Sequence, residues 1–217
     1  MGYMKQTLVY GGAVVAALLI AALLFGDQLF RPKVPKHAMV YPKFKTIESF
    51  ELDAAQGKWS DKQLTDKWTF MFFGYTYCPD ICPTTLSALK SFYNKLPPSI
   101  QSDSQIVLVS VDPERDTPDV LKQYTEAFDP SFVGITSSHE VLKPFVKSFG
   151  VVYYKVGDET DNYLVDHSAQ IFLIDPAKKR HAIFKKSMDN PTDGYEYDID
   201  QMVNDYLIIR NNYNSNN

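Results

Sequence analysis

Short apolar runs alternate with amphipathic segments over most of the chain. The runs are rich in Val, Ile and aromatic residues and end at turn-forming positions, which is typical of strands buried on both faces. They lie at residues 68–73, 106–111, 132–136 and 169–175. Between them, apolar residues recur at helical spacing. This alternation of strand and helix predicts a mostly parallel sheet covered by helices on both faces.

Helices are predicted where the helical spacing is bounded by start and stop signals. They cover residues 84–96, 118–128, a segment ending at Phe149, and residues 197–210. Asp116 or Thr117 is expected to cap the second helix, and Ser137 or Ser138 the third. In such α/β sheets, functional sites form where strands end at their carboxyl edge.

Two hairpins are predicted in addition to these elements. Residues 45–52 alternate well enough for a strand and lead into a hairpin connection at residues 53–61. Further along, residues 151–156 and 163–165 flank an acidic, polar loop. Each pair of segments is expected to form a small antiparallel ribbon.

An uncharged apolar stretch covers residues 8–25. Its length suits a helix that spans a bilayer. A cleaved signal peptide is the alternative, but its apolar core is usually shorter and no small-x-small cleavage site follows Phe25. Under either interpretation, the rest of the chain is expected to be exported from the cytoplasm. The seven residues before the stretch contain no arginine, which argues against a mitochondrial import peptide and favours a bacterial envelope.

Residues 26–44 contain several prolines and lysines and favour neither helix nor strand, so they are interpreted as an extended tether. The sequence therefore predicts one folded domain on a membrane anchor. Its parts are a short N-terminal segment at 1–7, a transmembrane anchor at 8–25, the tether at 26–44, the folded domain at 45–210 and a disordered tail at 211–217. The predicted location is the bacterial cytoplasmic membrane, with a single pass and the domain on the periplasmic or outer side.

The charge of the chain excludes one class of function. The net charge is −4 and the sequence pI is about 5.5. Lysines and arginines are scattered and form no basic cluster, whereas a nucleic-acid-binding domain concentrates them on one face. We therefore expect no nucleic-acid partner.

The two cysteines of the chain, Cys78 and Cys82, directly follow the apolar run at residues 68–73. If Cys78 opens a helix, Cys82 lies one turn above it on the same face. The pair can then form a disulfide, or two thiolates that bind one soft metal ion. The alternative is two small buried side chains without chemistry. Prolines after both cysteines and an aspartate between them favour a reactive turn over a helix core.

Of the four histidines, His167 is the candidate for a site. His37 lies in the tether, His139 in the first turn of a helix, and His181 among lysines in a surface-like stretch. His167 is predicted at the entry of a buried strand beside Asp166, where rigid structure would hold its ring. A lone histidine is also often a structural residue, and its position alone leaves that alternative open.

A site formed by Cys78, Cys82 and His167 would favour copper. Two thiolates and an imidazole form a soft, three-coordinate set that suits Cu(I). Cu(II) also fits, because it stands highest among divalent ions in the Irving–Williams order. A closed structural zinc site would require a fourth ligand.

Three segments of the chain resemble the Sco/SenC family of membrane-anchored, thioredoxin-like copper-binding proteins involved in cytochrome c oxidase assembly. They are GYTYCPDICP at residues 74–83, VDPERDT at 111–117 and YLVDHS at 163–168. The segments occur in the order found in the family, and the resemblance covers about residues 45–210. A Cys-x-x-x-Cys motif alone would be weak, but the three segments together are specific.

The resemblance implies a fold and a ligand set. The fold is α/β, with a thioredoxin-like, peroxiredoxin-related central sheet flanked by helices and carrying an inserted hairpin, preceded here by the predicted transmembrane helix. The implied copper ligands are Cys78, Cys82 and His167. Asp112, Asp116 and Asp166 are candidates for residues that support the ligands or form a docking surface, although Asp112 and Asp116 are interpreted first as helix caps or turn formers.

The resemblance implies two functions from different classes. The first is a copper metallochaperone that delivers Cu(I) or Cu(II) to the CuA centre of a cytochrome c oxidase subunit, without making or breaking a bond in a substrate. The alternative is a thiol–disulfide oxidoreductase that keeps the cysteines of the CuA site reduced, with Cys78 and Cys82 as the redox pair. Another periplasmic copper chaperone or a thioredoxin-like reductant is a further possible partner.

Overall fold

The computed structural model describes residues 20, 33–157, 163–167, 170–186 and 197–216. The predicted anchor at residues 8–25 lies outside this part of the chain except for Ile20, and the tip of the second hairpin and Ser168 also lie outside it. Among the helices that are described, none combines the length and the apolar character needed to cross a bilayer.

The chain divides into two compact units, residues 35–209 and the two chain ends at residues 1–34 and 210–217. The larger unit contains the sheets. In the smaller unit, the side-chain amide of Asn212 donates a hydrogen bond to the carbonyl oxygen of Lys33 at 2.9 Å.

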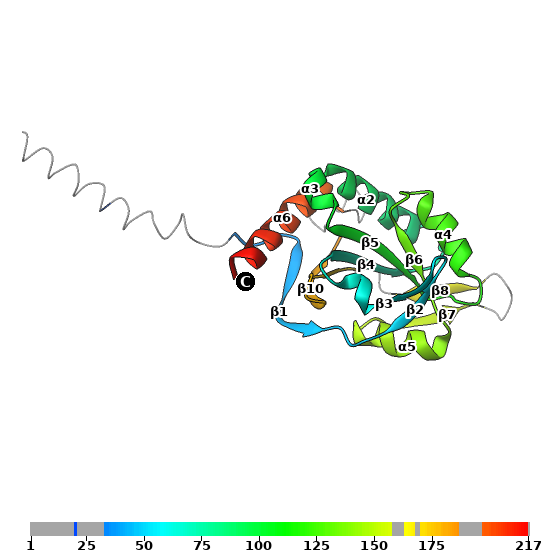
Figure 1. The fold of residues 1–217 in the computed structure, drawn as a ribbon. Helices are drawn as coiled ribbons and strands as arrows, with labels where there is room; N and C mark the ends of the chain where they lie inside the picture. Colours follow the sequence, from blue (N-terminus) through cyan, green and yellow to red (C-terminus); the bar gives the residue numbers. More distant parts are fainter. Residues whose placement is uncertain (1–19, 21–32, 158–162, 168–169, 187–196, 217) are drawn as a thin grey trace, which may run out of the picture. The chain divides into compact units, whose positions relative to one another are not determined.

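A six-stranded mixed sheet forms the centre of the larger unit (Figure 1). Its strands, in spatial order, are β1 (Ala38–Thr46), β10 (Lys179–Phe184), β9 (Ile171–Ile174), β4 (Trp68–Gly74), β5 (Ser104–Ser110) and β6 (Val133–Ile135). Strands β4, β5 and β6 are parallel, whereas β9, β10 and β1 add in antiparallel fashion. The prediction of a mostly parallel sheet is therefore wrong for the half beyond β4. There β9 and β10 are joined by a short turn, which makes them antiparallel, and the outer pairs β4–β9 and β1–β10 are antiparallel as well.

Two ribbons lie outside the main sheet. The first is formed by β2 (Glu51–Ala54) and β3 (Gly57–Ser60), and the second by β7 (Tyr153–Val156) and β8 (Leu164–His167). A short 3-10 helix, η1 (Asp61–Leu64), follows β3. The second hairpin was predicted at nearly these positions. The first was predicted with its turn too broad, since the strands pair up to Gly57, whose φ of 113° suits a residue without a Cβ.

Helices cover both faces of the main sheet. They are α2 (Ile81–Lys95), α3 (Pro98–Gln101), α4 (Pro118–Glu126), α5 (His139–Ser148) and α6 (Ile199–Asn216). Every residue of β4 is buried, and successive side chains point to opposite faces. Phe70 packs on Phe92 of α2 and Tyr206 of α6, whereas Phe73 packs on Phe145 and Phe149 at the α5 end. The hydrophobic core therefore holds β4 between two helical layers.

The predicted tether at residues 26–44 is wrong for its last part, because residues 38–44 belong to β1. The side chain of Asp205, buried on α6, accepts hydrogen bonds from the backbone N–H groups of Lys36, His37 and Ala38 at 2.9, 2.7 and 2.8 Å. The start of β1 is thus fixed to the domain. The tail predicted as disordered from residue 211 also differs, since α6 continues to Asn216.

His181 is a buried residue of β10 and not the surface residue expected from its lysine neighbours. Its ring stacks on Phe44 at a centroid distance of 4.2 Å and meets the edge of Trp68 at 5.3 Å. Its Nδ1 lies 3.2 Å from a carboxylate oxygen of Asp175, which is also buried. These contacts give His181 a structural role in the sheet.

Candidate metal centre

Both cysteines lie where the central strand β4 turns into helix α2. Cys78 is in the loop, with its N–H bonded to the carbonyl of Tyr75 at 3.4 Å, and Cys82 is buried in the first turn of the helix. The expectation that Cys78 opens the helix is therefore wrong by one turn. The helix begins at Ile81, after Pro79, and the loop before it brings the sulfur of Cys78 back to that of Cys82. Neither cysteine forms a disulfide in this structure.

His167 comes to the cysteines from the second hairpin. It is the last residue of β8, and its Nε2 lies 3.5 Å from the sulfur of Cys82. Ligand atoms of Cys78, Cys82 and His167 all lie within 4.8 Å of one another. The structure thus brings together the three residues that were singled out from the sequence. His167 was expected at the entry of a buried strand. It lies at the end of β8 in the two-stranded ribbon, shortly before the buried strand β9 begins at Ile171.

The two thiols have opposite acidities. The hydrogen bond from the Cys82 thiol, together with the His167 ring and the backbone N–H groups of Asp80 and Cys82, lowers the pKa of Cys78 to about 3 against the effect of burial. The same hydrogen bond to Cys78, and then burial, raise the pKa of Cys82. At neutral pH, Cys78 is therefore a thiolate stabilised at a helix N-terminus, and Cys82 is its proton donor.

The donor set fits a soft metal ion. Two sulfurs and an imidazole nitrogen converge, and no carboxylate belongs to this cluster within the described part of the chain. Such a set suits Cu(I), and thiolate with imidazole also holds Cu(II) in known sites. Hard ions such as Mg²⁺ or Ca²⁺, which require oxygen ligands, do not fit.

Tyr75 connects the cysteine loop to the hairpin that carries His167. Its side chain is buried, and its hydroxyl oxygen accepts a hydrogen bond from the backbone N–H of Val165 at 3.1 Å. Its ring meets the imidazole of His167 edge-on at 5.8 Å, and Phe72 approaches that imidazole in a similar way at 6.0 Å. These contacts fix β8 against the end of β4 and orient the histidine ring.

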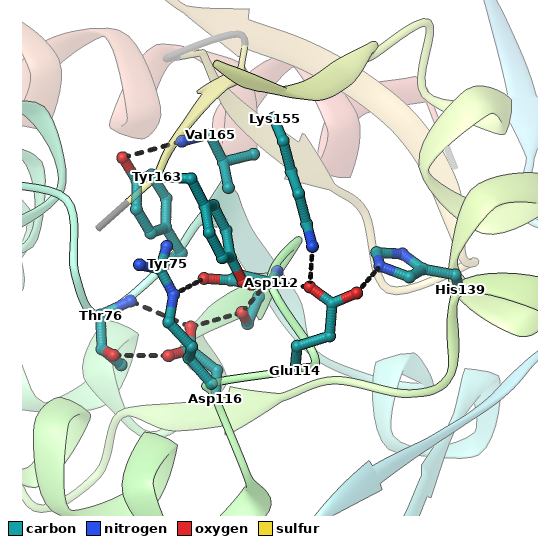
Figure 2. A network of polar contacts seen from close by, with 11 residues as sticks. Tyr75, Thr76, Asp112, Glu114, Asp116, His139, Lys155, Tyr163 and Val165 are labelled. Carbon is teal, nitrogen blue, oxygen red and sulfur yellow. Dashed lines mark hydrogen bonds and ion pairs between the residues drawn. The ribbon is translucent and has the colours of Figure 1, made fainter. Parts of the chain in front are cut away.

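The segment after β5 forms a second connection to the hairpin, drawn in Figure 2. The guanidinium of Arg115 lies over the ring of Tyr163 at 3.7 Å and over that of Tyr77 at 4.6 Å. The hydroxyl of Tyr163 donates to Asp112 at 2.6 Å, and Asp112 also pairs with Arg115 at 2.6 Å. Because Tyr77 precedes Cys78 and Tyr163 leads into β8, Arg115 holds both halves of the site.

Glu114 extends this network to the first strand of the hairpin and to α5. It pairs with Lys155 of β7, which holds its pKa below the usual range, and it lies 3.6 Å from Nε2 of His139 (Figure 2). His139 in turn contacts the hydroxyl of Tyr153 at 3.0 Å. His139 therefore supports the hairpin from outside the metal centre.

Asp116 fixes the start of the cysteine loop. Its carboxylate is buried and accepts hydrogen bonds from the N–H of Thr76 at 2.9 Å, from the hydroxyl of Thr76 at 2.5 Å and from that of Ser110 at 2.5 Å. Of the two residues predicted as the cap of α4, Thr117 is the cap and Asp116 is not. Burial raises the pKa of Asp116, and its three donors oppose that shift.

The sequence could indicate which residues support the site, but not how their side chains contact one another. Tyr75, Asp112, Arg115, Asp116 and Tyr163 all belong to the three motifs that carry the family resemblance. What the motifs could not show is which side chain contacts which. The pairing of Tyr75 with Val165, 90 residues apart, depends on the fold.

Known proteins match this chain in sequence and in structure. The SCO1/SenC family model matches residues 39–208. Protein SCO1 homolog 1, mitochondrial, of Arabidopsis thaliana is 38% identical over 144 residues, which are 65% of this chain and 43% of that protein. This chain therefore spans less than half the length of that relative.

Two solved structures are similar to this one. The crystal structure of Arabidopsis thaliana ScoI with copper bound matches with a TM-score of 0.68 and 32% identity, over 78% of this chain and 100% of that one. The solution structure of the apo Sco1 protein from Thermus thermophilus matches with a TM-score of 0.66 and 38% identity, over 77% and 92% of the two chains.

Proposed function

Because this chain belongs to the SCO1/SenC family and has its thioredoxin-like mixed α/β fold, we propose that it binds copper through Cys78, Cys82 and His167. The observation that carries the proposal is the convergence of two sulfurs and one imidazole nitrogen within 4.8 Å. The similar Arabidopsis protein has been solved with copper bound, which supports the choice of metal.

The acidities of the thiols suit reversible binding. Cys78 is already a thiolate, so only the thiol of Cys82 must lose a proton when copper binds, and the proton leaves to solvent. Reduction of both cysteines is required, since a disulfide offers no thiolate. The three residues leave copper short of a closed four-ligand shell, so an incoming ligand of a partner can attack without a preceding dissociation step.

The proposed role is delivery of copper to the CuA centre of a cytochrome c oxidase subunit. Cu(I) and Cu(II) are both proposed cargo, and another copper chaperone or a thioredoxin-like reductant is the proposed donor or activating partner. We further propose that residues 8–25 anchor the chain in a bacterial cytoplasmic membrane, with the domain on the periplasmic or outer side. Carbonate extraction of membranes, with and without those residues, tests the anchor.

A direct test is competition for Cu(I) between the reduced full chain and a chelator of known affinity, with and without the His167→Ala substitution. Loss of one of three ligands is expected to lower affinity by more than the ~10–100-fold that removal of an outer-shell partner costs. His37→Ala, away from the cluster, is the matched control. Weak binding by the unsubstituted chain, or no change in His167→Ala, would overturn the proposal.

The second candidate function is reduction of a partner disulfide, favoured by the thiolate at Cys78 beside a protonated Cys82. The sulfur of Cys78 would attack the partner disulfide, forming a mixed disulfide and releasing one partner thiolate. Cys82 would then lose its proton and attack Cys78, forming the intramolecular disulfide and releasing the second partner thiolate. Two electrons pass to the partner. A Cys82→Ser variant should trap the mixed disulfide, and its absence would exclude this function.

A further inference from the structure

A pocket of about 330 Å³ opens beside the candidate metal centre. It is bounded on one side by the cysteine loop and the start of α2 and on the other by the β7–β8 hairpin. Its lining residues are Tyr75, Cys78, Pro79, Asp80, Ile81, Val156, Leu164, Val165, Asp166 and His167. Two of the three proposed copper ligands therefore form part of its wall.

Large apolar side chains at this pocket face solvent. Leu164 is 48% exposed, Val156 45% and Ile81 38%, and they come from both sides of the pocket. Apolar side chains gathered around a concave site are typical of a surface that binds another molecule. Among the described residues, the hairpin strands that carry Val156 and Leu164 pair with each other and not with the main sheet, so these two side chains are not required to close that sheet.

The rim of the pocket is acidic. Asp80 and Asp166 are both exposed and line it, and no ion pair of either carboxylate with a lysine or arginine is found in the described ranges. Lys155, which pairs across the hairpin with Val165 next to Asp166, is engaged by Glu114. Asp166 accepts a hydrogen bond from the hydroxyl of Tyr154, which leaves its charge in place.

We propose that this pocket docks a polypeptide segment of the copper partner that presents one aliphatic side chain next to a lysine or arginine. The volume suits an aliphatic anchor, since a dry cavity of about 150 Å³ already accepts a benzene molecule. The cationic neighbour would lie against Asp80 or Asp166, where opposite charges favour encounter and fix register. The inference rests on the proposed copper-transfer function and adds the chemistry of the partner to it.

The acidic rim favours a basic peptide segment over two other occupants of the pocket, a membrane surface and a second copy of this chain. An anionic membrane surface would be repelled by Asp80 and Asp166 at the place where the apolar side chains must insert. A second copy of this chain, placed by a two-fold axis, would bring the same acidic rim against itself. A basic, aliphatic segment meets neither obstacle. Its position beside Cys78 and His167 would also place the partner's own ligands next to the metal.

The test uses the reduced, Cu(I)-loaded full chain, labelled with ¹⁵N and titrated with cysteine-free pentapeptides. Gly-Lys-Leu-Lys-Gly is expected to shift the amide signals of Ile81, Val156 and Leu164 in a saturable way. Gly-Lys-Ser-Lys-Gly and Gly-Glu-Leu-Glu-Gly are expected to bind at least tenfold more weakly, because each lacks one of the two recognition elements. Equal binding of all three, or shifts confined to other surfaces, would overturn the proposal.

Two variants locate the effect. Leu164→Ser is expected to weaken binding of Gly-Lys-Leu-Lys-Gly at least tenfold while the Cu(I) affinity stays within about twofold of the unsubstituted chain. Val141→Ser makes a similar change, without adding charge, at a residue of α5 that is 44% exposed and not part of the lining, and it should change neither quantity. Unchanged peptide binding in Leu164→Ser would exclude the pocket. A chain that fails to bind Cu(I) at all would instead contradict the proposed function.

Discussion

The sulfur of Cys82 fills the space that the missing side chain of Gly74 leaves open. A Cβ built on Gly74 would lie 2.8 Å from that sulfur, 2.9 Å from a ring carbon of Phe72 and 3.2 Å from a methyl of Leu108. All of these atoms are buried, so none can move out of the way freely. The last residue of β4 therefore sets the position of one proposed ligand.

Gly74→Ala is expected to destabilise the domain by about 1–3 kcal/mol, the usual cost of overpacking a core. It should also weaken Cu(I) binding, because the sulfur of Cys82 must shift. Urea unfolding measures the first effect and chelator competition the second. In a Cys82→Ala background the stability cost of Gly74→Ala should be smaller, and an equal cost in both backgrounds would show that the sulfur is not the limiting contact.

Tyr75→Phe removes the hydroxyl that accepts the N–H of Val165 and leaves that buried N–H without its partner. A loss of about 1–3 kcal/mol of unfolding free energy is expected. Since Val165 is two residues before His167, copper affinity should fall by about tenfold, as for other outer-shell changes. Tyr77→Phe, at an exposed position of the same loop, is the control. An unchanged affinity in Tyr75→Phe would mean that the hairpin is positioned by the Arg115 network alone.

The low pKa of Cys78 predicts its reactivity in the metal-free, reduced protein. An ordinary thiol loses about tenfold in alkylation rate for each pH unit below its pKa of about 8.5. Cys78 should instead react with iodoacetamide at a nearly constant rate between about pH 5 and 8, because it stays a thiolate throughout this range. Mass spectrometry of tryptic peptides separates Cys78 from Cys82.

Cys82→Ala supplies the internal check. The hydrogen bond from Cys82 is the largest cause of the low pKa, so its removal should raise the pKa of Cys78 and restore a falling rate at acid pH. A steep pH dependence for Cys78 in the unsubstituted chain would contradict the assignment of the thiolate.

Asp205→Ala should release the start of β1 without touching the metal centre. Three backbone N–H groups then lose their acceptor, so the amides of residues 36–38 should exchange with deuterium at least tenfold faster. Copper affinity should stay unchanged. Asp200→Ala, at an exposed position of the same helix, should alter neither exchange nor binding. Unchanged exchange in Asp205→Ala would show that pairing with β10 alone holds the segment.

The sequence predicted best those features that depend on local pattern. The seven consecutive buried residues of β4 and the apolar spacing of α2 are visible in any short window. The strand β1 was missed because it lies at the sheet edge, where Pro42 and exposed lysines are tolerated. Its pairing with β10 joins residues far apart in the chain, and no local pattern encodes that.

The candidate site was predicted as a set of residues and not as an arrangement. Cys78, Cys82 and His167 stand in recognisable motifs, so they could be singled out from the chain alone. The contacts of Arg115 with Tyr77 and Tyr163, and the close approach of Cys82 to Gly74, form only when segments that are distant in the sequence pack together. The misplacement of His181 has the same origin, since Phe44 and Trp68 reach it from distant strands.

Cys82 and His167 are 85 positions apart in the chain, so a metal ion bound by both would cross-link distant segments. An ion held by both would close that length of chain into a loop, as a disulfide does, and would remove loop entropy from the unfolded ensemble. Loading is therefore expected to raise the unfolding free energy of the domain, and release of the ion to lower it.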